Sequence, residues 1–128
     1  KFENLNFKKN QIIHRKGDDL VLKNLYKNAK AHIFPSLYEG FGLPLIESMY
    51  IGCPIICSNI KPFLEIAHKS AEFFDPKNEE NLLSSIEKVV YSNEYSKMLV
   101  KKGRERVKKF SWKNCSMETN KIYQSLIK

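Results

Sequence analysis

The stretch that decides the fold runs from Ala31 to Asn59 and reads AHIFPSLYEGFGLPLIESMYIGCPIICSN. It contains two short apolar segments, 31–34 and 55–57, of the kind that forms buried strands. The segment between them, about 43–50, has a helical pattern, with a proline in its first turn and a glycine just after its last turn. Continuously apolar strands separated by helices predict parallel β-α units, because a parallel sheet is covered on both faces and requires crossover connections.

The same alternation extends to both sides of this stretch. Apolar residues at helical spacing precede it, and helical and strand-like patterns alternate again after it. The further elements that we expect are a helix capped by Asp18 or Asp19, a helix from Pro62 to Ala67, a strand at 72–74 and, from Asn78 on, helices only, the last capped by Ser111. The expected fold class is α/β, a Rossmann-like parallel sheet with helices on both faces, ending in several helices.

Length and composition indicate one globular domain without a membrane-spanning helix. The chain has 128 residues, 42% of them hydrophobic and 28% charged, which excludes a disordered or collagen-like chain. No uncharged stretch reaches the roughly 18 residues that a spanning helix requires. Because the chain begins with Lys1 and shows no signal-peptide pattern, we expect it to begin inside a longer protein.

The cysteines and histidines favour a reducing, cytoplasmic setting and no metal site. The three cysteines are an odd number, and Cys53 and Cys57 are too far apart along a strand to form a disulfide. The three histidines occur singly, without the paired spacing that metal sites use. We expect structural roles for all six residues.

The net charge of +8 is concentrated at the end of the chain. Residues 1–96 hold twelve basic and twelve acidic side chains, whereas residues 97–128 hold ten basic and two acidic ones. One interpretation is a patch for nucleic acid or for an anionic membrane surface. The other, which we favour, is a solvated helix face, because the segment lacks the interleaved aromatic residues of a base-stacking surface.

The loop after the first strand carries the most distinctive chemistry. Gly40 and Gly42 allow backbone amides to approach a ligand, and the helix that follows adds a partial positive charge, so the loop is a candidate phosphate cradle. A plain tight turn explains the glycines about as well. Glu39 in the loop and Glu47 one turn into the helix would line one pocket and accept hydrogen bonds from sugar hydroxyls. The alternative is that Glu39 is exposed and Glu47 pairs with a nearby base.

Residues 34–49, FPSLYEGFGLPLIESM, closely resemble the glutamate-x7-glutamate signature of retaining glycosyltransferases with the GT-B fold, known as group 1 or family 4. Three further segments resemble the same family in the same order: Gly52–Asn59, Phe74–Pro76 and Phe110–Trp112. The resemblance implies the C-terminal, donor-binding part of a two-domain enzyme. It covers nearly the whole chain.

The resemblance also implies a reaction, transfer of a hexose from a nucleotide-sugar donor to a sugar or lipid-linked acceptor with retention at the anomeric carbon. Glu39 would be the catalytic-site residue that meets the donor sugar, and Glu47 would bind the ribose hydroxyls. The amides that would hold the sugar and diphosphate are those of Gly40, Phe41, Gly42 and Leu43. Such enzymes generally need no bound metal and no cofactor, and the leaving diphosphate helps to deprotonate the acceptor.

We therefore expect residues 1–128 to form one partial donor-binding domain, on which the helices of 78–128 pack. The last helix would either pack on this domain or face the N-terminal acceptor domain, which is absent, so the chain alone should be inactive. The expected process is polysaccharide or glycolipid biosynthesis in the cytoplasm, with possible peripheral contact at the inner face of the membrane and no nucleic-acid partner. The alternative function is a non-catalytic module for binding or interaction.

Overall fold

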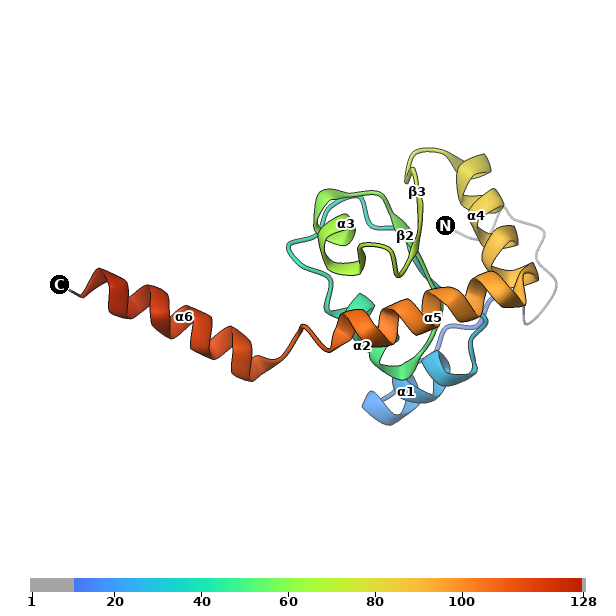
Figure 1. Ribbon diagram of the computed structural model, residues 1–128. Helices are drawn as coiled ribbons and strands as arrows, with labels where there is room; N and C mark the ends of the chain where they lie inside the picture. Colours follow the sequence, from blue (N-terminus) through green and yellow to red (C-terminus); the bar gives the residue numbers. More distant parts are fainter. Residues whose placement is uncertain (1–10, 128) are drawn as a thin grey trace.

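The computed structural model describes residues 11–127. Within them helices and strands alternate in the first half and only helices follow, as the α/β expectation required (Figure 1). The elements are α1 (Asp19–Asn28), β1 (His32–Phe34), α2 (Leu43–Ile51), β2 (Ile55–Ser58), α3 (Lys61–Ala67), β3 (Glu72–Phe74), α4 (Glu79–Tyr91), α5 (Asn93–Val107) and α6 (Trp112–Leu126).

The strands form one parallel sheet in the order β1-β2-β3. His32 of β1 is in register with Ile55 of β2, and Ser58 of β2 is in register with Phe74 of β3. β2 is central, and all of its residues are buried, as a continuously apolar strand in a parallel sheet should be. All carboxyl ends of the strands therefore lie at one edge of the sheet, where the connecting loops lead into the helices.

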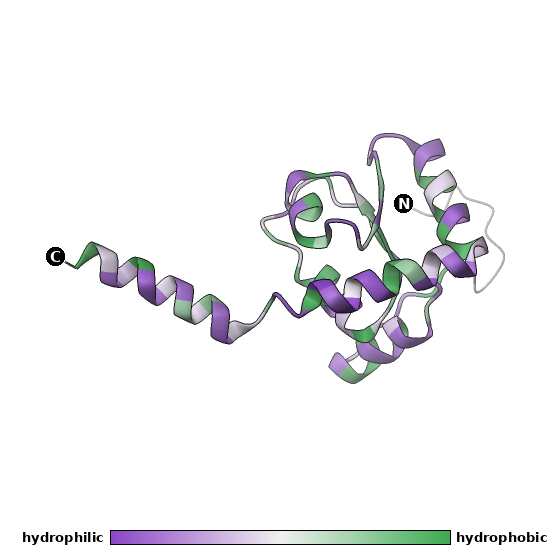
Figure 2. Ribbon diagram, in the orientation of Figure 1, coloured by the Kyte–Doolittle hydropathy of each residue, from purple (hydrophilic) through white to green (hydrophobic). Residues whose placement is uncertain are grey.

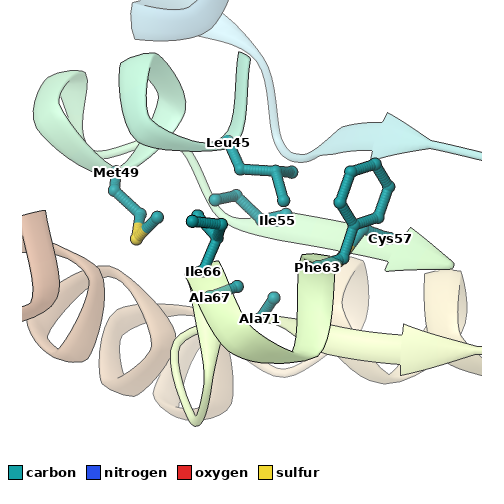
Figure 3. Packing of buried hydrophobic residues seen from close by; sticks show 8 residues of the cluster. All are labelled: Leu45, Met49, Ile55, Cys57, Phe63, Ile66, Ala67 and Ala71. Atoms are coloured by element: carbon teal, nitrogen blue, oxygen red, sulfur yellow. The ribbon is translucent and has the colours of Figure 1, made fainter. Parts of the chain in front are cut away.

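One face of the sheet is covered by α2 and α3. Successive side chains of a strand point to opposite faces, and Ile55 and Cys57 share this one. Their cluster, drawn in Figure 3, consists of Leu45, Met49, Ile55, Cys57, Phe63, Ile66, Ala67 and Ala71. Phe34, just before the loop between β1 and α2, packs against this cluster, and Leu45, just after the loop, belongs to it, so the cluster fixes both ends of that loop.

The opposite face is covered by α4 and α5. Ile56 of β2 and Phe74 of β3 pack there with Val89 and Leu99, and all four side chains are buried. Helices thus cover both faces of the sheet, which confirms the expectation from the apolar strands. Asp18, rather than Asp19, caps α1 by accepting a hydrogen bond from the amide of Val21 at 3.0 Å.

β1 is less buried than its apolar sequence predicts. Its middle residue, Ile33, is 39% exposed, so the expectation of a buried strand at 31–34 was wrong in this respect. Within the described residues β1 pairs with β2 alone and is an edge strand. An edge strand has no neighbour on its second side, and the side chain of Ile33 is therefore left partly uncovered.

Of the helices of 78–128, α4 and α5 pack on the sheet, whereas α6 does not pack on this domain as the first of its two alternatives required. No residue of α6 is buried, and in Figure 1 this helix extends away from the rest of the molecule. Its apolar and polar residues are both visible along its length in Figure 2. The physical reason is that the sheet has two faces and each is already covered by a pair of helices, so no apolar face remains for α6.

Candidate functional site

The candidate site is the loop of residues 35–42, which joins the carboxyl end of β1 to the amino end of α2. In open parallel sheets ligands bind at this edge, beyond the carboxyl ends of the strands. The loop leaves the sheet at Pro35, which cannot continue the hydrogen-bond ladder, and enters α2 through Gly42. The proline that ends the strand and the glycine that precedes the helix therefore determine where the loop lies.

Gly42 gives the loop its shape. It is the N-cap of α2, with φ of 119° and ψ of 50°, a conformation that side chains disfavour. A Cβ atom added there would lie 3.1 Å from the ring of Phe63, so this turn packs closely against the core of the domain. The glycine is therefore required both by the backbone angle and by the close packing.

The amides at the start of α2 are not used by the part of the protein that the structure describes. Within residues 11–127, the amides of Gly40, Phe41, Gly42 and Leu43 have no hydrogen-bond acceptor, and no side chain caps the helix. Pro44 follows and has no N–H. Amides left open at the amino end of a helix form an anion site, because the helix dipole adds positive potential there.

Glu39 is held in the same loop by a short-range contact that the sequence analysis missed. The hydroxyl of Ser36 donates a hydrogen bond of 2.9 Å to Oε1 of Glu39, and the glutamate is half-buried. The remaining lone pairs of the carboxylate are left for other donors. A serine three residues before an acid in a loop was the available signal.

Glu47 lies on the exposed side of α2 and approaches α1 instead of a base. Within the described residues no Lys, Arg or His forms an ion pair with it, so the alternative of a paired base does not hold there. Burial raises the pKa of the Tyr26 hydroxyl, and the nearby charge of Glu47 raises it further. Glu47 is thus a solvent-accessible carboxylate beside a tyrosine.

A hollow borders the loop, but neither glutamate lines it. Its walls are apolar and aromatic, and its lining residues are Phe41, Leu43, Ile46, Lys109, Phe110, Ser111, Trp112, Asn114, Cys115 and Glu118. Phe41 and Phe110 meet edge to face there, with ring centroids 6.3 Å apart. The expectation that both carboxylates line one pocket is therefore not met by this hollow.

A partly buried polar pair beneath the loop joins α2 to the sheet. Nδ1 of His32 lies 2.6 Å from the hydroxyl of Ser48, which donates to the carbonyl of Pro44 at 2.8 Å. The ring of His32 also packs between Tyr26 and Phe34. Burial lowers the pKa of His32 and so disfavours its protonated form, and the contacts of the ring make it a structural anchor.

The described residues contain no group of three or more His, Cys, Asp or Glu side chains that could hold a metal ion. All three cysteines are free; burial raises the pKa of Cys53 to about 11 and that of Cys57 to about 12, whereas Cys115 is exposed. In residues 11–127 we find no helix with the length and apolar character to cross a membrane.

Comparison with known proteins identifies the loop and its surroundings as parts of a family. The sequence profile described as "Glycosyl transferases group 1" matches residues 1–106. O-antigen chain mannosyltransferase B of Escherichia coli is 32% identical over 108 residues, which is 84% of this chain and 28% of that protein. The MMP alpha-(1->4)-mannosyltransferase of Mycolicibacterium hassiacum is 30% identical over 122 residues, which is 91% of this chain and 30% of that protein.

A solved structure shows the same fold. Sucrose-phosphate synthase of Thermosynechococcus elongatus superposes with a TM-score of 0.70 and 29% sequence identity, over 80% of this chain and 26% of the other. The chain thus spans less than a third of the length of each of these similar proteins. Since the profile covers most of the chain, including the loop, both glutamates and both core clusters, the chain belongs to the group 1 glycosyltransferases, which have the GT-B fold.

Proposed function

We propose that this protein transfers a hexose from a nucleotide-sugar donor to an acceptor hydroxyl and retains the configuration of the anomeric carbon. The observation that carries the proposal is the row of open amides from Gly40 to Leu43 at the amino end of α2. A diphosphate is the anionic part of a nucleotide sugar, and such a row of amides is suited to it.

The two carboxylates have complementary tasks in this proposal. Glu39 is at the catalytic centre, where its free lone pairs accept hydrogen bonds from hydroxyls of the donor sugar, while Ser36 fixes its orientation. Glu47, accessible to solvent on α2, accepts hydrogen bonds from the ribose hydroxyls. The sugar, the diphosphate and the ribose would then be held by one loop and the first turns of one helix.

The proposed chemistry is a front-face displacement. The acceptor oxygen forms a bond to the anomeric carbon from the same side on which the bond to the diphosphate oxygen breaks. The acceptor proton passes to the departing diphosphate, whose negative charge is stabilised by the amides of Gly40, Phe41, Gly42 and Leu43. No step requires a metal ion or another cofactor in this proposal.

The names of the similar proteins suggest the donor class. Two of them are mannosyltransferases, one of O-antigen chains. We therefore take a mannosyl nucleotide as the first candidate donor, with a sugar or lipid-linked acceptor in polysaccharide or glycolipid biosynthesis. The acceptor would bind to an N-terminal GT-B domain, so the chain of 128 residues should not turn over alone. The free thiols agree with a cytoplasmic setting.

Calorimetric titration of the full-length protein with UDP-, GDP- and ADP-sugars tests the proposal. Glu39→Gln and Glu47→Gln should each weaken the binding of one donor by about 1 to 3 kcal/mol, the cost of losing hydrogen bonds to a charged group. Glu87→Gln, an exposed glutamate on α4, is the matched control for loss of one charge.

Gly40→Ala adds a second and more geometric test. A Cβ atom at Gly40 meets no protein atom within 4 Å, so it would project into the space that the donor should occupy. This variant should fold normally and bind the donor more weakly. If no donor binds to the folded protein, or if Glu87→Gln weakens binding as much as the other variants do, the proposal is wrong. Donor binding without transfer to any acceptor would favour a non-catalytic module.

A further inference from the structure

Positively charged side chains are dense along α5 and the two residues after it. Residues 97–109 contain seven basic side chains and one acidic one, Glu105. Lys108 forms an ion pair of 2.9 Å with Glu105 and cancels its charge. The helix crosses the front of the molecule in Figures 1 and 2, and with α4 it covers one face of the sheet. The positive charge of this segment therefore lies on one side of the fold.

Lysines from other elements extend this charge on both flanks of α5. The hollow on one flank, of about 680 Å³, is lined by Lys30, which precedes β1, together with residues of α5. The hollow on the other flank is lined by Lys69, from the turn between α3 and β3. Lys101 borders both hollows. We define the basic strip as Lys30, Lys69, Lys97, Lys101, Lys102, Arg104 and Lys109.

The charges of the basic strip are available for a partner. All seven residues are exposed, and none of them is in an ion pair within the part of the chain that the structure describes. Arg106, by contrast, is already used by the protein. It donates hydrogen bonds to the carbonyls of Glu65 and Ile66 at the end of α3 and lies over the ring of Phe110. The packing thus separates a structural arginine from a set of free cations.

We propose that the basic strip is a docking surface for an anionic lipid bilayer. Like charges that are gathered on one side repel each other unless a negative surface compensates them, and a bilayer with anionic headgroups is such a surface. Lysine is a compact point charge that suits the diffuse charge of a membrane, and six of the seven residues are lysines. Tyr91, 82% exposed just before α5, is of the residue type found at membrane interfaces.

The same features disfavour a nucleic acid as the partner. Single strands are bound by stacking of successive bases on several aromatic rings. α5 contains one aromatic residue, Tyr95, which is half-buried. Its hydroxyl donates a hydrogen bond to Glu72 and its ring is not free to stack on a base. The one arginine of the strip, Arg104, lies against Gly52, where an added Cβ would be 2.8 Å from its guanidinium. The strip therefore lacks both the stacking rings and a freely presented bidentate arginine.

The basic strip runs along α5 and reaches both edges of the sheet. Lys30 and Pro54 line one hollow of the strip and precede β1 and β2, whereas the loop of residues 35–42 follows β1. Lys109, at the other end of the strip, lines the hollow that borders this loop. The inference goes beyond the proposed function, and it stands whether or not the protein transfers a sugar.

Co-sedimentation with vesicles tests this inference. The purified protein is mixed with vesicles of phosphatidylcholine that contain about one third phosphatidylglycerol, and with vesicles of phosphatidylcholine alone, at about 0.1 M salt. We expect binding to the first and not to the second, with a steep loss as salt is raised. Binding to both alike would contradict the proposal and would point to the exposed apolar residues of α6.

Two triple variants separate the basic strip from net charge. Lys97→Gln, Lys101→Gln and Lys102→Gln together should weaken the partition by about 100-fold, since each lysine near an anionic surface contributes roughly a factor of five. The control is Lys23→Gln, Lys61→Gln and Lys77→Gln, which removes the same charge from exposed sites outside the strip and should have a much smaller effect.

All six lysines are exposed, so folding should be preserved, and circular dichroism spectra check it for both proteins. Equal losses for the two triple variants would overturn the proposal, because general charge and not the strip would then cause binding. Tighter binding to a single-stranded oligonucleotide than to the anionic vesicles, lost in the strip variant, would overturn it in favour of nucleic acid. Absence of binding to the anionic vesicles would also overturn it.

Discussion

Gly42 and Gly40 are two glycines of one loop, and they should respond to alanine in opposite ways. At Gly42 the backbone has φ of 119°, whereas Gly40 has no positive φ. An added Cβ at Gly42 would lie 3.1 and 3.3 Å from two atoms of the Phe63 ring, and at Gly40 it would meet nothing within 4 Å. The pair therefore isolates strain and packing from the general effect of adding a methyl group.

The magnitude follows from two contributions. Holding alanine in a sparsely populated backbone region costs on the order of 1–3 kcal/mol. The Phe63 ring cannot move away easily, because it is fully buried and stacks on Phe34 at a centroid distance of 4.9 Å, and overpacking of such a site costs about 1–3 kcal/mol more. We expect Gly42→Ala to lower the free energy of unfolding by about 2–6 kcal/mol, and Gly40→Ala to change it by less than about 1 kcal/mol.

Urea denaturation followed by far-ultraviolet circular dichroism measures the difference. Trp112 is a poor fluorescence reporter for this purpose, since it is 80% exposed on α6 and away from the packed clusters. A loss of about 2 kcal/mol or more is a large fraction of the 5–15 kcal/mol that a domain usually has. If the two variants differ by less than about 1 kcal/mol, the reasoning about strain at Gly42 is refuted.

Three further predictions concern other parts of the molecule. Burial lowers the pKa of His32, so the unfolded chain binds a proton more readily than the folded chain near and below about pH 6.5, and the free energy of unfolding should fall as the pH is lowered through that range. Denaturation at pH 7.5 and at pH 5.5 should therefore show a smaller loss of stability in His32→Gln than in the wild type. Tyr95→Phe removes the hydroxyl that donates to Glu72, a carboxylate that is only 15% exposed and also pairs with Lys88. Thermal melting should show that the free energy of unfolding falls by about 1–2 kcal/mol, and no measurable fall would mean that this hydrogen bond contributes nothing to stability. Alkylation of the native protein near pH 8, followed by mass spectrometry, should modify Cys115 alone, because burial raises the pKa of the other two thiols well above that pH; rapid labelling of a second cysteine would contradict their burial.

The sequence predicted the central part of the fold well because local signals and burial agree there. Ile55 to Cys57 is continuously apolar and becomes the fully buried central strand, and Gly52 ends α2 in a left-handed conformation. The caps at Asp18 and Ser111 were also found, since each places a short polar side chain before a helical pattern. These features depend on neighbours within a few residues of one another.

The features that were missed depend on partners distant in the sequence. Nothing local distinguishes His32 as the partner of Ser48, sixteen positions away. The exposure of Ile33 depends on whether another strand lies beside β1, and that of Trp112 on whether another surface covers α6, so an apolar pattern alone could not decide either. Periodicity identifies an apolar face, but it does not say what covers that face.

The two proposals use regions of the fold that are distant at one end and adjacent at the other. The open amides at Gly40–Leu43 belong to the connection that leaves β1 at its carboxyl end, whereas Lys30 belongs to the connection that enters β1 at its amino end. A parallel sheet puts these two kinds of connection at opposite edges of one layer. Lys109, at the other end of the basic strip, lines the hollow beside Phe41 and Leu43. A bilayer that contacts the whole strip would therefore lie close to the donor loop at Lys109, whereas at Lys30 the two proposed sites are on opposite edges of the sheet.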